Sequence, residues 1–293
     1  MIYFTGDIHG DVRRVIYDIN RLDIQKGDTI VILGDAGLNY YGNDRGDRRN
    51  KELLNSQGIT VFCIHGNHEM RPDTLESYHT TKWNGGTVFV EDDFPNLLFA
   101  KDGEIFDLGG YTAIVIGGAY SVDKFYRLQR GYGWFADEQP SDEVKTAVES
   151  KLDSIGWMVD CVLSHTCPDR FIPTEAFLPG LDQSTVDRST EDWLGTIEKR
   201  LVYGYWFCGH WHIDKRVDDM HFLMKSYEVL PELQTCSIPV DEDVLAGFLD
   251  FCAQNHTTAD LVVRSFFRFC IKPENRSLLQ RMFKNEEGEK PNE

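Results

Sequence analysis

The chain has 293 residues, of which 41% are hydrophobic and 27% charged, and its 48 acidic and 30 basic residues give a net charge of −18. This hydrophobic fraction is enough for a packed core, and the length suits one large domain or a domain with an appendage. The acidic charge argues against a nucleic-acid coat or a basic membrane-surface protein, because both need cations facing phosphates. A small phosphorylated substrate is not excluded.

Nothing in the sequence predicts a membrane or secreted location. No segment approaches the roughly 18–20 consecutive apolar residues of a transmembrane helix, and the N-terminus runs directly into a predicted strand, which leaves no room for a signal peptide. The seven cysteines are odd in number and include no Cys-x-x-Cys pair. Such a pattern is typical of free thiols in a reducing compartment. We therefore expect a cytoplasmic protein that does not bind membranes.

The first third of the chain alternates between strand and helix patterns. Apolar, β-rich runs predict strands over residues 2–5, 29–33 and 59–64. Apolar residues at helical spacing predict a helix over 12–22, and a second helix is expected over 46–57. Strands that alternate with helices indicate a mixed or largely parallel sheet covered by helices.

The middle of the chain contains short β-rich runs in place of the alternating strands and helices. Residues 86–116 hold four short β-rich runs separated by Gly, Asp and Pro, and we expect these runs to form a second sheet. Ser141 is placed to cap a following helix. A strand is then predicted over 159–163, a helix over 190–201 and another strand over 205–208.

Three helical patterns follow after residue 232, over 242–253, 259–271 and 275–284, and a charged tail ends the chain. We predict a fold of class α/β in three parts. These are a domain over 1–232, a helical extension over 233–284 and a disordered tail over 285–293.

Polar side chains follow five of the predicted strands at the point where each strand ends. They are Asp7 and His9, Asp35, Asn67 and His68, His165, and His210 and His212. Taken singly, each has an ordinary structural interpretation, as a turn residue or as a buried, hydrogen-bonded histidine. Ligands of α/β sheets bind beyond the carboxyl ends of the strands, so we expect these side chains to meet.

The chemistry of these side chains favours metal binding. Oxygen and imidazole donors without cysteine suit Mn²⁺, Fe²⁺ or Zn²⁺. There are more donors than one tetrahedral ion uses, but two ions with a shared carboxylate would use them. Such a pair of ions activates water and clamps the oxygens of a displacement at phosphorus.

Five ordered motifs carry a family resemblance. They are Gly6-Asp7-Ile8-His9-Gly10, Gly34-Asp35, Gly66-Asn67-His68-Glu69, Ser164-His165 and Gly209-His210-Trp211-His212. In this order, over residues 1 to about 215, they resemble the motifs of the calcineurin-like metallophosphoesterases. The resemblance implies a four-layer α/β/β/α sandwich. It also implies a phosphoesterase that hydrolyses a phosphate mono- or diester by attack of a metal-activated hydroxide.

The resemblance also implies residue roles and a cofactor. The cofactor would be two divalent ions, with Mn²⁺ as the first expectation and Fe or Zn as alternatives. His68 would bind no metal and would act as general acid for the leaving oxygen. The ligands would be Asp7, His9 and His212 for one ion, Asn67, His165 and His210 for the other, and Asp35 as the bridge.

Two alternatives for the function stay open. One is a protein Ser/Thr phosphatase, which the ending of the third motif in Glu69 favours. That branch of the family follows its second motif directly with Val-Asp-Arg-Gly, whereas here Ala36 follows Asp35 and Asp44-Arg45-Gly46 comes later. The other is a metal-binding scaffold without turnover, although all seven ligand positions are filled. We expect a phosphorylated small molecule or a phosphopeptide as substrate and no long nucleic acid, and the oligomeric state is left open.

Three further sets of side chains have two interpretations each. Candidates to bind the phosphate, or else solvated surface groups, are Arg45, Arg48, Arg49, Arg71 and Arg127. An aromatic set would either wall a pocket for an aromatic leaving group or pack between sheets: Tyr120, Tyr126, Tyr132, Trp134 and Phe135. A basic stripe would either contact an acidic partner or dock on the acidic catalytic domain: Arg264, Arg268 and Lys272.

Overall fold

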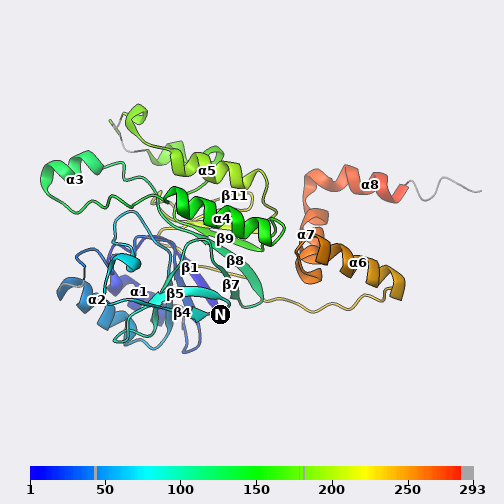
Figure 1. Cartoon of the computed structure of the whole chain (residues 1–293), viewed down its shortest axis with the longest axis horizontal. Coiled ribbons are helices and arrows are strands. Elements are labelled where there is room, and N and C mark those ends of the chain that lie inside the picture. The colour runs from blue at the N-terminus through cyan, green and yellow to red at the C-terminus, as the bar shows by residue number, and fades with distance from the viewer. Residues whose placement is uncertain (43–44, 178, 181, 285–293) are drawn as a thin grey trace, which may run out of the picture.

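The computed structural model describes residues 1–42, 45–177, 179–180 and 182–284. Two sheets stack on each other and helices cover both outer faces, with α1 and α2 on one side and α4 and α5 on the other (Figure 1). This arrangement confirms the α/β/β/α sandwich that the motifs implied.

The first sheet has the strand order β13-β1-β2-β3-β6-β5-β4. Strands β1, β2, β3 and β6 run parallel, whereas β13, β5 and β4 pair antiparallel with their neighbours. The strands are β1 (Ile2–Thr5), β2 (Thr29–Ile32), β3 (Thr60–Cys63), β4 (His79–Trp83), β5 (Gly86–Val90), β6 (Leu97–Ala100) and β13 (Glu228–Val229). Helices α1 (Val12–Arg21) and α2 (Arg45–Asn55) connect its first three strands.

The second sheet has the order β11-β12-β10-β9-β8-β7, and its central strands β8, β9, β10 and β12 run parallel. The strands are β7 (Ile105–Leu108), β8 (Tyr111–Ile116), β9 (Cys161–Ser164), β10 (Tyr205–Cys208), β11 (Lys215–Val217) and β12 (Met220–Phe222). The α-helices described between β8 and β10 are α3 (Lys124–Arg130), α4 (Asp142–Ser154) and α5 (Ser189–Glu198). Ser141 caps α4 as predicted, with its side chain accepting a hydrogen bond from the backbone N–H of Val144.

The prediction that residues 86–116 form a second sheet by themselves is wrong. Strands β5 and β6 complete the first sheet, and only β7 and β8 begin the second. A β pattern indicates which side chains face a core, but the partner of a strand depends on contacts far away in sequence. The short outer strands β4, β11 and β13 and the helix α3 were not predicted, because most of their side chains are exposed or half-buried and show no apolar period.

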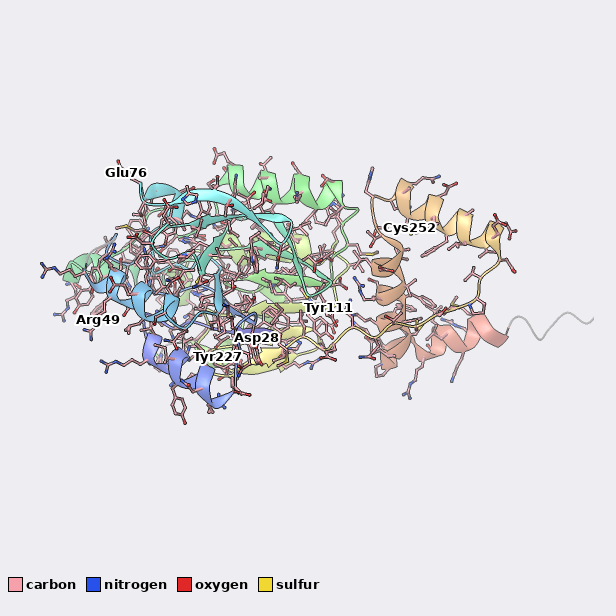
Figure 2. All side chains as sticks on the ribbon, turned by 90° about the horizontal axis from the view of Figure 1, so that it is seen from below. Asp28, Arg49, Glu76, Tyr111, Tyr227 and Cys252 are labelled. Carbon is pink, nitrogen blue, oxygen red and sulfur yellow. The ribbon has the colours of Figure 1, made fainter. Side chains whose placement is uncertain are left out.

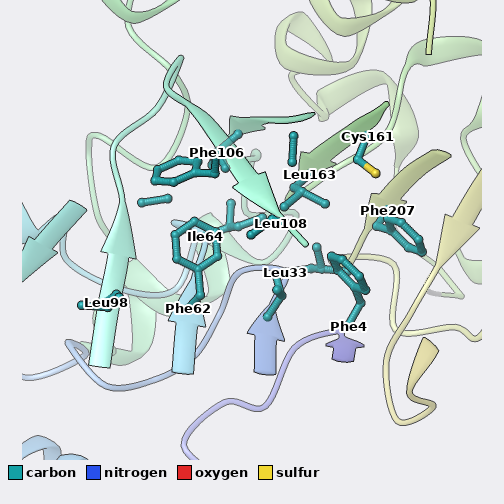
Figure 3. Close-up of a cluster of buried hydrophobic side chains, with 14 of the residues drawn as sticks. Phe4, Leu33, Phe62, Ile64, Leu98, Phe106, Leu108, Cys161, Leu163 and Phe207 are labelled. Carbon is teal, nitrogen blue, oxygen red and sulfur yellow. The ribbon is translucent and has the colours of Figure 1, made fainter. Parts of the chain in front are cut away.

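Alternate side chains of the strands divide between different cores. Val31 of β2 packs between the sheets with Phe4 and Phe207, whose rings stack with centroids 4.4 Å apart (Figure 3). Its neighbours Ile30 and Ile32 face the opposite way, into the core under α1 and α2. Fully burying a side chain of this size stabilises a fold by about 1.5–3 kcal/mol. The central strands are therefore fixed on both faces, and their ends are held rigidly.

The helical extension lies beside the sandwich and is joined to it by residues 230–241 (Figure 1). It consists of α6 (Glu242–Gln254), α7 (Ala259–Ile271) and α8 (Arg276–Lys284). At the end of the sandwich nearest the extension, the Tyr111 hydroxyl donates a hydrogen bond to the backbone oxygen of Pro231, 3.0 Å away (Figure 2).

The basic stripe on α7 docks on the acidic sandwich, as the second of its two interpretations predicts. Asp160, which is fully buried, accepts hydrogen bonds from Arg264 at 2.8 and 3.0 Å and from Arg268 at 3.1 Å. Lys272 pairs with Asp219 at 2.5 Å. Burial raises the pKa of Asp160, but the bonds from Arg264 and from the Thr112 backbone outweigh burial and hold the pKa below its usual range.

The division into folding units at residue 232 stays a prediction, and the predicted disordered tail, 285–293, lies outside the described residues. All seven cysteines are free. Among the described residues, no helix has both the length and the apolar character needed to cross a membrane.

Candidate metal centre

The carboxyl ends of five strands bring the seven candidate ligands together. The ends of β1, β2 and β3 come from the first sheet, and those of β9 and β10 from the second. The two sheets meet here, since His165 after β9 lies with Nε2 only 2.8 Å from Oδ1 of Asn67 after β3. The seven side chains therefore lie close together, as expected from their positions at the strand ends.

The first donor group consists of Asp7, His9 and His212. The Nε2 atoms of the two histidines lie 3.0 Å apart, and Oδ2 of Asp7 lies 3.1 Å from His212 Nε2 and 3.8 Å from His9 Nε2. Two ligands at right angles, each bonded to a metal at about 2.1 Å, lie about 3 Å apart. The three atoms therefore have the spacing of ligands around one ion. Asp7 is buried and both histidines are exposed, so this group faces solvent on one side.

The second donor group consists of Asn67, His165 and His210. Asn67 Oδ1 lies 2.8 Å from His165 Nε2 and 3.0 Å from His210 Nδ1, so the three donors converge. Asp35 lies between the two groups. Its Oδ1 is 3.7 Å from His165 Nε2 and its Oδ2 is 3.8 Å from His9 Nδ1. One carboxylate therefore faces both donor groups.

The charges of the cluster suit a divalent cation. Asp7 and Asp35 are both buried, and buried carboxylates need a positive partner. Burial raises the pKa of Asp7, but the hydrogen bond with His212 and the nearby His165 and His9 hold it well below its usual range, so the carboxylate stays ionised. Burial also keeps the pKa of His210 well below its usual range, which leaves a neutral imidazole able to bind a metal.

Four of the seven candidate ligands have a left-handed backbone. The φ angles are 45° at His9, 48° at Asp35, 64° at His210 and 51° at His212. For residues other than glycine this conformation costs about 1–3 kcal/mol, and it is concentrated at functional sites. It turns the chain sharply just after a strand, so that His210 and His212 both reach the cluster.

Two motif glycines leave room for the ligands. A Cβ atom at Gly66 would overlap the Asp35 carboxylate, and one at Gly34 would overlap the imidazole of His165. Gly34 also has a φ of +96°, a region that other residues rarely adopt. Glycine is therefore required at both positions because a side chain there would collide with a candidate ligand, and not only because the chain turns.

Neighbouring groups orient the donors. The Nδ2 of Asn67 donates to the Ser121 hydroxyl at 2.8 Å, which turns its Oδ1 toward the two histidines. His165 Nδ1 lies 2.8 Å from the backbone oxygen of Leu33, and this contact directs Nε2 into the cluster. Sequence reasoning missed both partners. The one signal that could have found Ser121 is the Gly117-Gly118 run directly after β8, because a strand end of this sheet lies near the site.

His68 lies beside the cluster and belongs to neither donor group. Its backbone N–H donates to Asp35 Oδ1 at 2.8 Å, while its ring nitrogen Nε2 lies 3.3 Å from Nη2 of Arg127 and 4.0 Å from Oδ1 of Asp123. Burial, assisted by the positive charge of Arg127, lowers the pKa of His68. Glu69, the next residue, is buried, and burial together with Asp35 raises its pKa to about 8.

The five candidate phosphate-binding arginines differ in how near they lie to the cluster. Arg127 lies beside His68 and lines an open cleft of about 850 Å³, with its Nε paired to Asp123 at 2.8 Å and its Nη2 near His68. Arg49 lines the same cleft. Arg71 is bound to Asp102 and Arg48 pairs with exposed carboxylates. Arg45 is exposed at the start of α2, and Asp44 lies outside the described residues.

A second, smaller pocket of about 210 Å³ adjoins the cluster. Its lining includes the candidate ligands Asp35, Asn67 and His210, several apolar side chains, and the charged side chains of Arg188, Asp123, Asp187 and Glu191. Of the aromatic set considered for a leaving-group pocket, only Tyr120 is among the described lining residues. Phe135 is buried elsewhere, and Tyr126 and Tyr132 are exposed.

Comparison with known proteins adds a family model, described as calcineurin-like phosphoesterase, which matches residues 1–214. Among solved structures, the chain is similar to Yfce, a phosphoesterase from E. coli, at 20% sequence identity. That likeness covers 40% of this chain and 68% of the other, with a TM-score of 0.20. The comparison with curated proteins gives no match. The assignment therefore depends on the family model.

Proposed function

The chain belongs to the calcineurin-like phosphoesterase family, and we propose that it hydrolyses phosphate esters with two divalent cations, Mn²⁺ first among them, held by the cluster of seven residues. The observation that carries this proposal is the position of Asp35. Its two carboxylate oxygens face donor groups on either side, at 3.7 Å and 3.8 Å, as a shared ligand would.

The ligand roles are inferred from the two donor groups. Asp7, His9 and His212 would hold one ion and Asn67, His165 and His210 the other, with Asp35 shared. When bound, such ions lower the pKa of water and neutralise charge on phosphoryl oxygens. The chain itself fixes the ligand positions through rigid strand ends and the contacts with Ser121 and the Leu33 carbonyl.

His68 is proposed as the general acid for the leaving oxygen. Its imidazole lies beside the donor groups and not inside them, so it is free to carry a proton. Its lowered pKa favours the neutral form, but a phosphate anion within about 4–6 Å would favour the protonated form. Arg127, 3.3 Å away, would attract the same anion and hold the ester close to the imidazole.

The substrate is proposed to be a phosphorylated small molecule. The net charge of −18 disfavours long nucleic acid, and the smaller pocket beside the cluster, about 210 Å³, has room for a compact organic group. A phosphopeptide is the competing substrate, and the assay below includes one.

The test is reconstitution of the full chain. Protein stripped with a chelator and reloaded with Mn²⁺ is assayed on an aryl monoester, an aryl diester, a phosphopeptide, a cyclic nucleotide and a dinucleotide, and bound metal is counted by elemental analysis. We expect about two ions per chain and turnover that follows their loading. His79→Ala, an exposed histidine of β4, serves as the control.

Three results would contradict the proposal. Full turnover without a bound transition metal would exclude the metal mechanism. One ion per fully active chain would exclude the dinuclear site. Two tightly bound ions with no turnover on any ester would favour the scaffold alternative.

A further inference from the structure

The smaller pocket is distinct in character from the open cleft. Its described apolar lining includes Phe177 and Trp211, together with Ile172 and Val186. None of these side chains can bind a metal ion, and the indole N–H of Trp211 is the one hydrogen-bond donor among the four, yet they lie beside the candidate ligands. A wall of this kind suits the organic part of an ester, since apolar surface gains free energy when it leaves water.

The aromatic wall is anchored to the cluster itself. Trp211 stands between His210 and His212 in the sequence, and its ring centroid lies 5.2 Å from that of His210. The Phe177 ring lies 6.3 Å from the Trp211 ring with the planes tilted by 31°. Both rings line the pocket, so a flat ring can pack against aromatic surface there.

The same pocket carries a cation. Arg188, half-buried, lies with its guanidinium carbon 5.7 Å from the centre of the Phe177 ring and donates to Gln183 Oε1 at 3.4 Å. A planar guanidinium over an aromatic ring extends a flat surface and offers donors at its edge. Asp187 and Glu191 also line the pocket, so it suits a ring that carries hydrogen-bond acceptors for Arg188 and donors for a carboxylate, as heteroaryl groups do.

The smaller pocket and the open cleft share lining residues, so two organic groups of one ester can lie next to each other at the site. His68, Asp123 and His212 line both. A phosphorus atom held at the cluster would therefore have one cavity of about 850 Å³ and another of about 210 Å³ next to it. A monoester has one organic group and fills one of them, whereas a diester has two.

We propose that the smaller pocket is a subsite for an aromatic or heteroaromatic substituent that stays on phosphorus, and that the open cleft receives the leaving group. The preferred substrate is then a phosphodiester with an aromatic arm. This inference rests on the proposed function, because it requires the phosphorus to be held at the cluster.

The experiment compares Phe177→Ala with Phe267→Ala in the Mn²⁺-loaded full chain. Phe267 is an exposed aromatic residue on α7, so its loss controls for the removal of a ring elsewhere. The probes are bis(4-nitrophenyl) phosphate, methyl 4-nitrophenyl phosphate and 4-nitrophenyl phosphate, which share one leaving group. We expect wild type to have its highest kcat/KM on the first, after correction for the uncatalysed rates.

For Phe177→Ala we expect the KM for bis(4-nitrophenyl) phosphate to rise about tenfold with little change in kcat, which is the signature of lost binding to one aromatic contact. The KM for the methyl ester should rise less, and Phe267→Ala should match wild type on all three probes. A second variant, Ala176→Trp, narrows the pocket without removing its aromatic wall and should raise the same KM. Circular dichroism of each variant verifies folding.

The outcomes separate the two claims. If loaded wild type hydrolyses none of the three esters, the proposed function is wrong. If it hydrolyses them but prefers the monoester, or if folded Phe177→Ala and Ala176→Trp change all three KM values alike, the subsite is wrong and the proposed function stands.

Discussion

His68→Ala tests the proposed division between metal ligands and proton donor. The substitution removes an imidazole whose Nε2 lies 3.3 Å from Arg127, but it keeps the backbone N–H that donates to Asp35 Oδ1 at 2.8 Å. Alanine retains that donor, and the imidazole belongs to neither donor group. We therefore expect both ions to stay bound.

The expected loss lies in the rate. Positioned proton transfer contributes a factor of roughly 10²–10⁴. At about 1.36 kcal/mol for each factor of ten, this corresponds to about 2.7–5.4 kcal/mol of transition-state stabilisation. The loss should be largest for an alkyl phosphate, whose alkoxide must be protonated as it leaves. It should be much smaller for a nitrophenyl ester, because nitrophenolate leaves as a stable anion.

The assay measures kcat for both esters and counts bound metal in the same samples. His165→Ala is the comparison, because His165 Nε2 lies 2.8 Å from Asn67 Oδ1 inside the second donor group. It should lose metal and slow both esters alike. His68 is not the general acid if His68→Ala loses metal, or if it slows the two esters by the same factor.

Three further substitutions test the site and its supports. Asp35→Asn removes the charge shared by both donor groups, so elemental analysis should find fewer than two ions per chain together with a lower rate; full occupancy at normal rate would exclude a bridging role. Gly34→Ala places a Cβ atom into the imidazole of His165 and should lower the free energy of unfolding by more than about 2 kcal/mol. Gly58→Ala has open space around it, so its free energy of unfolding should fall only by the cost of backbone strain. Equal losses of stability in thermal denaturation would contradict the packing argument. Asp160→Ala removes the carboxylate partner of Arg264 and Arg268 and should cost about 3 kcal/mol, the lower end of the range for a broken buried pair, because both arginines are partly exposed. It should also expose residues 230–241 to protease, whereas Asp93→Ala at an exposed pair should cost under about 1 kcal/mol. In the native chain, this anchor should be lost only as the pH falls below about 4, because the folded pKa of Asp160 lies below its usual value; release at neutral pH would contradict that.

The central strands were predictable because each is buried on both faces and reads as an unbroken apolar run. Thr29–Ile32 is such a case, and its end marks Asp35 as a candidate ligand. The partners of β5 and β6 were not predictable, since β6 pairs with β3 through contacts that connect residues about 36 positions apart, as in Val61 with Leu97. Local periodicity carries no information about such pairs.

The site shows the same limit. Motif spacing identified all seven candidate ligands, because each ends a strand in a recognisable turn. Motif spacing does not extend to the groups around them: Ser121 orients Asn67, Arg127 lies beside His68, and Phe177 lines the smaller pocket. Trp211 stood in a motif, but its neighbours gave no sign that its ring forms part of a pocket wall.

The left-handed backbone at His9, Asp35, His210 and His212 bears on how this chain can evolve. Glycine adopts that conformation without penalty, so a glycine at any of these positions would relax the backbone while deleting a candidate ligand. A substitution by glycine that raises thermal stability at one of these four positions would therefore lower turnover. In a mutant library selected for heat resistance alone, these four positions should be among the first to change, and a second selection for activity should hold them fixed.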